Sequence, residues 1–469
     1  MSPTSVYSFF SRIYQTSLYA FLSAGLGACG TPDVTLLAQK ENAPTVQSAT
    51  VVPSTQSFRF SGSLPHNQLI VGLEPNEEVQ LRLTQHQEKS DGVLRVGLLL
   101  PLSGAAAPVG QALLNAAQLA LFDVATERLV LQIYDTQGNP DDATSAATLA
   151  ISQGAQLLLG PVFSASVKAA ALPARAAGIN MIAFTNDPSA AAPGVFVIGF
   201  LVHEQVRQII EYARTQSIER FAALIPNSVY GQTVLDAMAQ IVEVSAGTLI
   251  RVEHYDPFGT DLSDVVRRLA RYELRHQALL EQREELEARG DEVSLLALKR
   301  LERVDTLGDV DFDAVLVPER GGRLTELAAL LPFYDVDPGR VQVLGTMLWD
   351  ESDLGLEPAL VGGLYPAPAL AAHRKFKDRY RRYFSSSPPA VAGHGYDAVA
   401  LTAALSLARP LDPFTSDAIT VSSGFSGVDG IFRFLPTGLS ERGFTILEVT
   451  RAGTEIVKPA ATTFQAAQF

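Results

Sequence analysis

The chain has 469 residues, 47% hydrophobic and 18% charged, a balance typical of a folded globular protein. This length exceeds what one hydrophobic core usually holds, so we expect two lobes. The net charge of −14 would repel phosphates and argues against a nucleic-acid partner, and the single cysteine excludes an intrachain disulfide.

The first 28 residues are typical of a signal peptide. Arg12 precedes an apolar run over 17–26, which is too short to span roughly 30 Å of hydrocarbon permanently. The run ends in Leu-Gly-Ala-Cys at 26–29, which is similar to a bacterial lipobox. We therefore expect a signal peptide over 1–28 and attachment to the membrane through a lipidated Cys29. The alternative is ordinary signal cleavage beside a free, buried cysteine.

Residues 29–92 differ in composition from the rest of the chain. They are rich in Thr, Gln, Ser, Pro and Asn and show little helical periodicity, which predicts a flexible tether. Within them, 58–60 and 69–71 favour short strands. Gly30-Thr31 lack the aspartate that often follows the cysteine of inner-membrane lipoproteins. We therefore expect a periplasmic protein whose lipid anchor lies in the outer membrane rather than the inner membrane.

A regular alternation of strands and helices begins at residue 94. Residues 94–100 are continuously apolar, as in a strand buried on both faces of a parallel sheet. The alternation predicts a doubly wound parallel sheet. Its further expected elements are helices at about 110–126 and 141–153, a helix opening at 161–164, and strands at 129–134, 155–160 and 180–184.

The same pattern recurs and predicts a second lobe. Its expected elements are strands at 220–225, 248–252, 314–317 and 341–345, with a helix from 230–231 to about 244. The fold class is therefore α/β, with two doubly wound parallel-sheet lobes and a cleft at the carboxyl ends of the strands. The expected boundaries are 93–199 and 368–425 for lobe 1, 200–367 and 426–456 for lobe 2, and 457–469 for a C-terminal tail.

Residues 265–307 are dense in Arg, Glu, Leu and Lys and interrupt the second lobe. Leu279, Leu280 and Leu286 lie near helical spacing among these charges. The segment predicts a charged helical hairpin broken at Gly290-Asp291. It is either a solvated structural pair of helices or an arm that docks a partner.

Six short stretches resemble the leucine-binding-protein-like branch of the type I periplasmic binding proteins in their order and spacing. They are 96–104, 135–136, 159–164, 230–231, 395–399 and 427–434. The resemblance runs from about residue 93 to 456. It implies two lobes that close on an amino acid or a related small molecule, as in receptors of ABC uptake systems.

Within that superfamily the chain is most similar to the penicillin-binding protein activators. The similarity lies in 183–187, in the charged insertion before 311–314, and in 344–350. It implies a lipoprotein that stimulates a bifunctional peptidoglycan synthase. The best-known activators carry an N-terminal helical-repeat domain, and the sequence between Cys29 and Val93 lacks that pattern.

The candidate cleft residues of the first lobe follow its strands. Ser103 and Gly104 come after the first strand, and Ser164 opens a helix whose N–H groups could hold a carboxylate. The resemblance implies that this loop contacts an amino acid's α-carboxylate, and the alternative is that Ser164 is only the N-cap. Thr185 and Asn186 follow the fourth strand and face the same cleft by analogy, or they belong to an ordinary turn.

In the second lobe the resemblance implies that Tyr230 points into the cleft, where it binds a ligand or plugs a closed cleft. It also implies that Asp350 lies near the place where amino-acid binders hold the α-ammonium group. Its neighbour Glu351 is an alternative for that role.

Motifs of enzymes are absent from the sequence. No run matches the P-loop, the His-Glu-x-x-His zinc motif or a Gly-x-Ser-x-Gly elbow. We therefore expect no catalytic residues, no metal and no cofactor. The leading hypothesis is a lipoprotein that binds and regulates a penicillin-binding protein, and the alternative is a solute receptor for amino acids.

Overall fold

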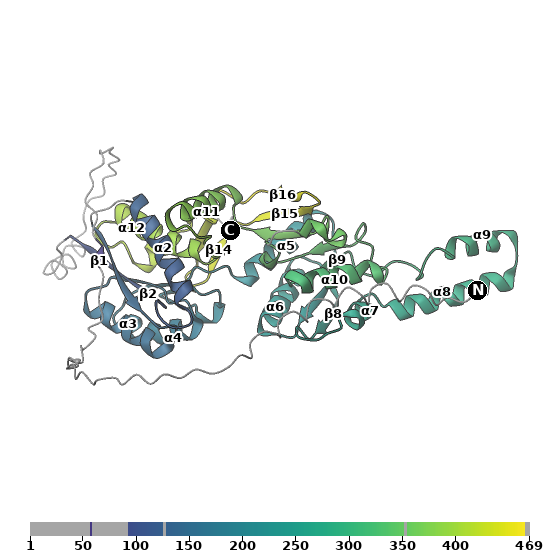
Figure 1. Cartoon of the computed structure of the whole chain (residues 1–469), viewed down its shortest axis with the longest axis horizontal. Coiled ribbons are helices and arrows are strands. Elements are labelled where there is room, and N and C mark those ends of the chain that lie inside the picture. Colours follow the sequence, from purple (N-terminus) through teal and green to yellow (C-terminus); the bar gives the residue numbers. More distant parts are fainter. Residues whose placement is uncertain (1–56, 59–91, 125–127, 351–353, 465–469) are drawn as a thin grey trace, which may run out of the picture. The chain divides into compact units, whose positions relative to one another are not determined.

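The computed structural model describes residues 57–58, 92–124, 128–350 and 354–464, which form two α/β lobes and a small third sheet (Figure 1). The predicted signal peptide, the anchor residue Cys29 and most of the predicted tether lie outside these residues. Within the predicted tether the structure describes one strand, β1 (Ser57–Phe58), which pairs antiparallel with β3 of the first sheet. No helix in the described ranges is both long enough and apolar enough to cross a membrane.

The first lobe is built on a sheet with the order β1-β3-β2-β4-β5-β6, parallel except for β1. Helices α2 and α12 cover one face, and α3 and α4 cover the other. In β2, Leu98 and Leu100 pack under α2 and α12, whereas Leu99 packs under α3 and α4. Both faces are therefore buried, which explains the continuous apolar run. The elements are β2 (Leu94–Leu100), β3 (Leu129–Asp135), β4 (Leu157–Leu159), β5 (Met181–Ala183), β6 (Val195–Val197), α2 (Ala107–Val124), α3 (Pro140–Ser152), α4 (Ser164–Ala176) and α12 (Ala392–Ala408).

The second lobe is built on a sheet with the order β16-β15-β11-β10-β9-β7-β8. Strands β7 to β11 run parallel, and β15 and β16 extend the sheet antiparallel. Helices α5 and α6 cover one face, and α7 and α10 cover the other. Together the two sheets confirm the predicted fold class. The elements are β7 (Arg220–Pro226), β8 (Thr248–Tyr255), β9 (Ala314–Leu316), β10 (Gln342–Leu344), β11 (Leu364–Ala367), β15 (Thr445–Thr450), β16 (Gly453–Lys458), α5 (Val202–Thr215), α6 (Val229–Val244), α7 (Ser263–Leu269) and α10 (Gly321–Phe333).

The chain passes between the lobes at three places: from β6 to α5, from β11 to α11, and from β14 to β15. The third passage differs from the predicted boundary. Residues 426–442, assigned from the sequence to lobe 2, lie in a small antiparallel sheet whose Phe432 and Phe434 join the core of the first lobe. The passage therefore falls between Arg442 and Thr445. This sheet and the remaining short elements are β12 (Phe425–Gly427), β13 (Gly430–Phe434), β14 (Ser440–Arg442), α11 (Leu370–Phe384), α13 (Ser416–Ile419), η1 (Pro188–Ala190), η2 (Met347–Trp349), η3 (Leu354–Leu356) and η4 (Pro358–Leu360).

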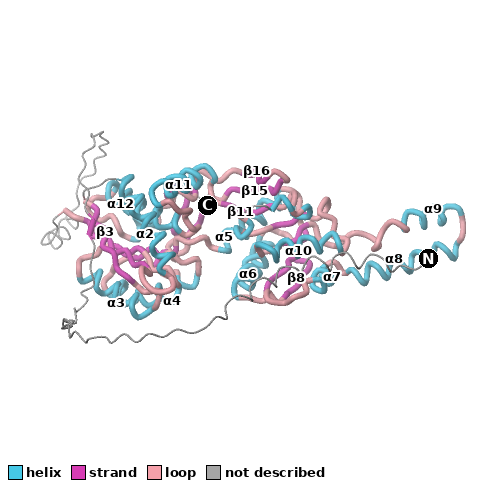
Figure 2. Tube along the Cα trace, viewed as in Figure 1, coloured by secondary structure: helices cyan, strands magenta, loops and turns pink. Residues whose placement is uncertain are grey.

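The charged insertion forms a helical hairpin, α8 (Tyr272–Arg289) and α9 (Glu292–Leu301), which Figure 2 shows as two helices joined by a tight turn. The break falls at the predicted dipeptide. Gly290 ends α8 in a left-handed conformation, φ 59°, and the Asp291 side chain caps α9 by accepting from the Ser294 N–H at 2.8 Å. The preceding α7 packs in the core of the second lobe. We call α8 and α9 the arm.

Candidate functional site

The carboxyl ends of the parallel strands gather the predicted cleft residues at one edge of each sheet, where doubly wound folds bind ligands. In the first lobe the loops after β2, β3 and β4 lie against one another. A Cβ at Gly104 would lie 3.5 Å from the Gln137 carbonyl oxygen, and one at Gly138 would lie 3.3 Å from the Phe163 ring. Both glycines have positive φ, and glycine is the residue that adopts this backbone without strain.

Asp135, at the end of β3, binds the loop that holds Ser103. Its Oδ1 accepts from the backbone N–H groups of Leu102 at 2.8 Å, Ser103 at 3.3 Å and Gln137 at 2.8 Å. Desolvation raises the pKa of Asp135, but hydrogen bonds from the Ser103 hydroxyl and from these N–H groups outweigh it and hold the pKa below its usual value. The carboxylate is therefore ionised at neutral pH, and its Oδ1 is engaged by the backbone N–H groups of the Ser103 loop.

Ser164 likewise lies beside a carboxylate, that of Asp187. Desolvation raises the pKa of Asp187, but hydrogen bonds from the Ser164 and Ser189 side chains and the charge of Lys168 lower it overall. The N-cap of α4 is Phe163 rather than Ser164, and it makes no side-chain capping bond. The alternative role of Ser164 as a simple cap is therefore not what the structure shows.

Thr185 and Asn186 form the turn that leads to Asp187. Thr185 is buried, and its Oγ1 accepts from the Asp187 N–H at 3.1 Å, whereas Asn186 is exposed. Thr185 therefore positions Asp187, and the edge of the first lobe presents an anionic group where the resemblance implied a pocket for an anion.

In the second lobe Tyr230 lies just after β7 and meets Thr346, which follows β10. The two hydroxyl oxygens are 2.8 Å apart, and Thr346 is fully buried. Burial, together with the charge of Glu319, raises the pKa of Tyr230 to about 12, so this hydroxyl stays protonated and can donate or accept a hydrogen bond.

A second hydroxyl bond lies at the same edge and was missed from the sequence. Tyr255, the last residue of β8, donates to Glu319 Oε2 at 2.7 Å, and Glu319 lies just beyond β9. Glu319 Oε1 also accepts from the Arg320 N–H at 3.1 Å. We call Tyr230, Tyr255, Glu319 and Thr346 the tyrosine–glutamate cluster. The available signal was position, since each member follows or ends a predicted strand.

Asp350 lies elsewhere. It is exposed. Burial, and then the charge of Asp350, raises the pKa of Tyr365. Tyr365 belongs to the core under α7 and α10, whereas Tyr230 packs against the core under α5 and α6. The structure thus brings Tyr230 to Thr346, and it places the charge of Asp350 near Tyr365 instead.

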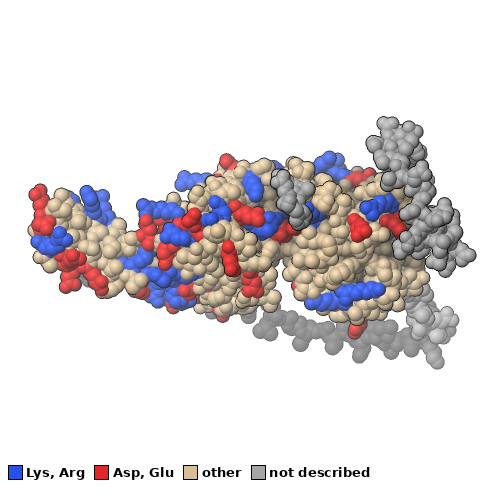
Figure 3. All heavy atoms as spheres, turned by 180° about the vertical axis from the view of Figure 1, so that it is seen from behind, with Lys and Arg blue, Asp and Glu red and all other residues tan. Residues whose placement is uncertain are grey.

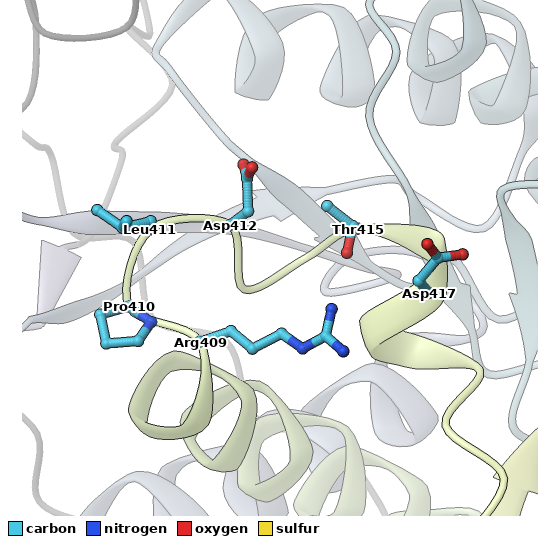
Figure 4. Close-up of a pocket in the computed structure, with 6 residues that line it drawn as sticks. All are labelled: Arg409, Pro410, Leu411, Asp412, Thr415 and Asp417. Atoms are coloured by element: carbon cyan, nitrogen blue, oxygen red, sulfur yellow. The ribbon is translucent and has the colours of Figure 1, made fainter. Parts of the chain in front are cut away.

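A hollow of about 410 Å³ lies in the loop between α12 and α13. Figure 4 shows the Arg409 side chain extending toward Thr415 and Asp417 there. This loop lies at the amino-terminal edge of the first sheet. Arg128 Nη2 binds the Pro410 carbonyl oxygen, and Asn180 Nδ2 binds that of Phe414, and both of these residues precede strands. The hollow is therefore at the opposite edge from the predicted cleft residues.

Five buried ionisable side chains lie where the chain passes between the lobes: His373, His394, Asp397, Asp429 and Arg442. Arg442 Nη2 donates to the Ile198 carbonyl oxygen at 2.9 Å, and its Nη1 lies 3.7 Å from Asp397 Oδ2. His373 Nδ1 lies 2.6 Å from Asp429 Oδ1. We call these residues the crossover cluster. Across the described ranges no group of three or more His, Cys, Asp or Glu side chains is placed to hold a metal ion.

Comparison with known sequences identifies the superfamily. A profile of the periplasmic binding protein family matches residues 93–454. A Leu/Ile/Val-binding protein of Rhizobium johnstonii is 23% identical over 191 residues, and an uncharacterised protein of Rickettsia prowazekii is 24% identical over 188. These two alignments cover 38% and 40% of this chain, and they span only about half of each relative, 51% and 50%.

Comparison with solved structures shows the same fold. A putative branched-chain amino acid ABC transporter protein from Rhodospirillum rubrum superposes with a TM-score of 0.62 at 18% identity, covering 78% of this chain and all of that one. The C-domain of LpoA from Haemophilus influenzae, a regulator of PBP1A, superposes with a TM-score of 0.57 at 15% identity, covering 77% and 99%.

Proposed function

The chain belongs to the periplasmic binding protein family, and from that membership we propose that it is a non-catalytic protein of the cell envelope that binds and regulates a penicillin-binding protein. In this proposal Cys29 carries a lipid that holds the protein at the outer membrane. The similarity in fold to the LpoA C-domain supports a regulatory role.

The observation that carries the proposal is the pair of ionised carboxylates at the first-lobe edge, Asp187 beside Ser164 and Asp135, whose Oδ1 accepts from the Ser103 N–H at 3.3 Å. In this superfamily an amino-acid ligand brings a carboxylate to the loop after β4, and here an ionised carboxylate already lies beside the serine. Two unit charges of the same sign 4 Å apart repel by about 4 kcal/mol at an effective dielectric constant of 20. Asp135 lies beside Ser103 in the same way. The first-lobe edge is therefore poorly suited to an amino acid.

The arm supplies a surface for a protein partner. Val293, Leu295 and Leu296 on α9 are exposed, the two leucines at 57% and 58%. Figure 3 shows charged side chains of both signs between the neutral ones over this part of the surface. Exposed apolar groups rimmed by charges are typical of protein interaction sites, so we propose that the arm contacts the synthase.

The test is the binding of the full chain to a purified bifunctional peptidoglycan synthase, together with the rate of glycan-strand synthesis. The double variant L295D/L296D should weaken binding at least tenfold and remove stimulation, because it places charges in the apolar contact. The matched control L407D/L411D changes two exposed leucines of the first lobe and should bind as the wild type does. A wild-type chain that leaves the synthase unbound and its rate unchanged would contradict the proposal.

The tyrosine–glutamate cluster favours a second candidate, a receptor for a small amino compound. The Glu319 carboxylate, which binds the Tyr255 hydroxyl, and the Tyr230 hydroxyl oxygen can each accept a hydrogen bond from an ammonium group. A ligand at about 100 times its dissociation constant stabilises the folded state by about 2.7 kcal/mol. A thermal shift of several degrees with a free amino acid, lost in Y230F, would favour this receptor over the regulator.

A further inference from the structure

Helix α11 (Leu370–Phe384) differs in charge from the rest of the molecule. It carries six basic side chains and one acidic side chain, Asp378, a net charge of +5 in a chain whose net charge is −14. The basic residues are Arg374, Lys375, Lys377, Arg379, Arg381 and Arg382.

One face of α11 fixes the helix to the first lobe. His373, Phe376 and Tyr380 are buried, and the Tyr380 hydroxyl oxygen accepts from Asn115 Nδ2 of α2 at 3.1 Å. The basic side chains other than those of Lys377 and Arg379 are exposed on the remaining surface. The helix is therefore held rigidly with most of its positive charge facing solvent.

The protein itself neutralises only part of this charge. Arg379 forms an ion pair with Asp123, and Arg381 lies 3.7 Å from Asp378. Among the described residues, Lys377 and Arg382 have no carboxylate within ion-pair distance, and Lys375 acts only through its charge on Asp123, which already pairs with Arg379. The five residues that follow the helix, 385–389, include no acidic side chain.

Helix stability accounts for only part of the pattern. Cations in the last turn favour the negative end of the helix dipole, which is a role for Arg381 and Arg382. Lys375 and Lys377 lie in earlier turns, where this effect has faded. Repulsion among the unpaired cations also costs stability, so a bound anionic partner would relieve it.

We propose that the basic face of α11 docks the protein onto an anionic phospholipid surface. Beyond the charge, Tyr383 at the end of the helix is 65% exposed, and Lys, Arg and Tyr are the residues that settle among lipid headgroups. This membrane contact is additional to the proposed regulation of a synthase and does not depend on it.

The experiment measures binding of the full chain to vesicles by sedimentation. Every protein carries Cys29→Ser, so that no lipid anchor contributes. Vesicles of phosphatidylethanolamine with phosphatidylglycerol are compared with vesicles of phosphatidylcholine alone. The test variant is K375Q/K377Q/R382Q, since glutamine keeps the helix propensity of lysine and arginine. The control R289Q/K299Q/R300Q removes the same three charges from exposed positions of the arm.

We expect the parent to bind the anionic vesicles and not the neutral ones. Each Lys or Arg near an anionic surface strengthens binding by about 1 kcal/mol, or about fivefold, so the test variant should bind about 100-fold more weakly. The control should bind like the parent, and salt at about 1 M should abolish binding. Equal losses in both triple variants, equal binding to neutral vesicles, or binding only to soluble polyphosphate would each overturn the proposal.

Discussion

At the scale of single residues, the buried carboxylates of the crossover cluster pack directly against two glycines, where a larger residue would not fit. A Cβ at Gly393 would overlap the Asp429 carboxylate, and one at Gly427 would overlap that of Asp397. His394 lies in the same space, with its ring 4.6 Å from that of Phe200. Burial and then the positive charge of Arg442 lower the pKa of His394 to about 3, although Asp429 opposes the shift. His394 is therefore neutral in the folded protein at all physiological pH values.

This neutrality gives a pH-dependent stability. The unfolded histidine has a pKa of about 6.5, so it takes up a proton between pH 7 and pH 5 and the folded one does not. Over that range the histidine should lower the free energy of unfolding by about 2 kcal/mol. Asp397 and Asp429 titrate as well, so the measured quantity is the difference between the wild type and H394Q in urea unfolding at each pH.

As the pH falls from 7 to 5, the free energy of unfolding of H394Q should rise relative to that of the wild type. A difference between the wild type and H394Q that does not change from pH 7 to pH 5 would contradict a neutral, buried His394.

At the scale of elements, the arm is held at its two ends by different means. At its tip the chain reverses through Gly290 and the Asp291 cap. At its base Arg275 is buried and donates to the Gly308 carbonyl oxygen and to Asp335. The base therefore belongs to the second lobe, whereas α9 depends on the turn and on its packing against α8.

The turn predicts a local effect. G290A places a Cβ on a residue with φ 59°, which costs roughly 1–2 kcal/mol for an L-residue. We expect faster hydrogen exchange of the α9 amides with little change in the exchange of the sheets, because the cost falls on the arm.

The control is G322A, which makes the same chemical change in α10, where the backbone is helical and nothing lies within 4 Å of the new Cβ. It should leave exchange unchanged or slow it. Equal exchange of α9 in G290A and the wild type would show that the left-handed turn is not needed.

At the scale of the whole molecule, Arg442 links all three passages between the lobes. It ends β14 at the third passage, donates to the Ile198 carbonyl oxygen at the first, and lies beside Asp397 of α12. The negative charge of Asp429 lies in the same cluster, bound to His373 of α11 after the second passage. Arg442 thus lies among buried charges of the first lobe, at the points where the chain passes to the second lobe.

Replacing Arg442 by a neutral residue should therefore lower the free energy of unfolding substantially. Breaking one side of a buried ion pair destabilises a protein by about 3–5 kcal/mol, because the other charge stays buried. We expect R442M to lose stability in that range. R433M, which breaks the more exposed pair with Glu441 on the neighbouring strand, should lose about 1 kcal/mol or less. Chemical denaturation of both variants checks this, and equal losses would show that Arg442 is no more important than Arg433.

The amino-acid sequence by itself determined the elements and the fold class. The apolar run of β2, the helix and strand periods that follow it, and the break at Gly290-Asp291 are local patterns. A run of neighbouring residues suffices to show which face of a strand or helix is buried, since the period of the pattern is the period of the element. The order of the motifs also indicated the superfamily, which the match over 93–454 supports.

The tertiary structure alone decided which elements and side chains meet. A strand such as β13 fits either sheet by its pattern, and only the packing of Phe432 and Phe434 places it with the first lobe. The binding of the Leu102 N–H by Asp135 and of the Tyr255 hydroxyl by Glu319 joins loops from different strands. Such contacts depend on how residues far apart in the chain are brought together, and periodicity within one segment carries no information about them.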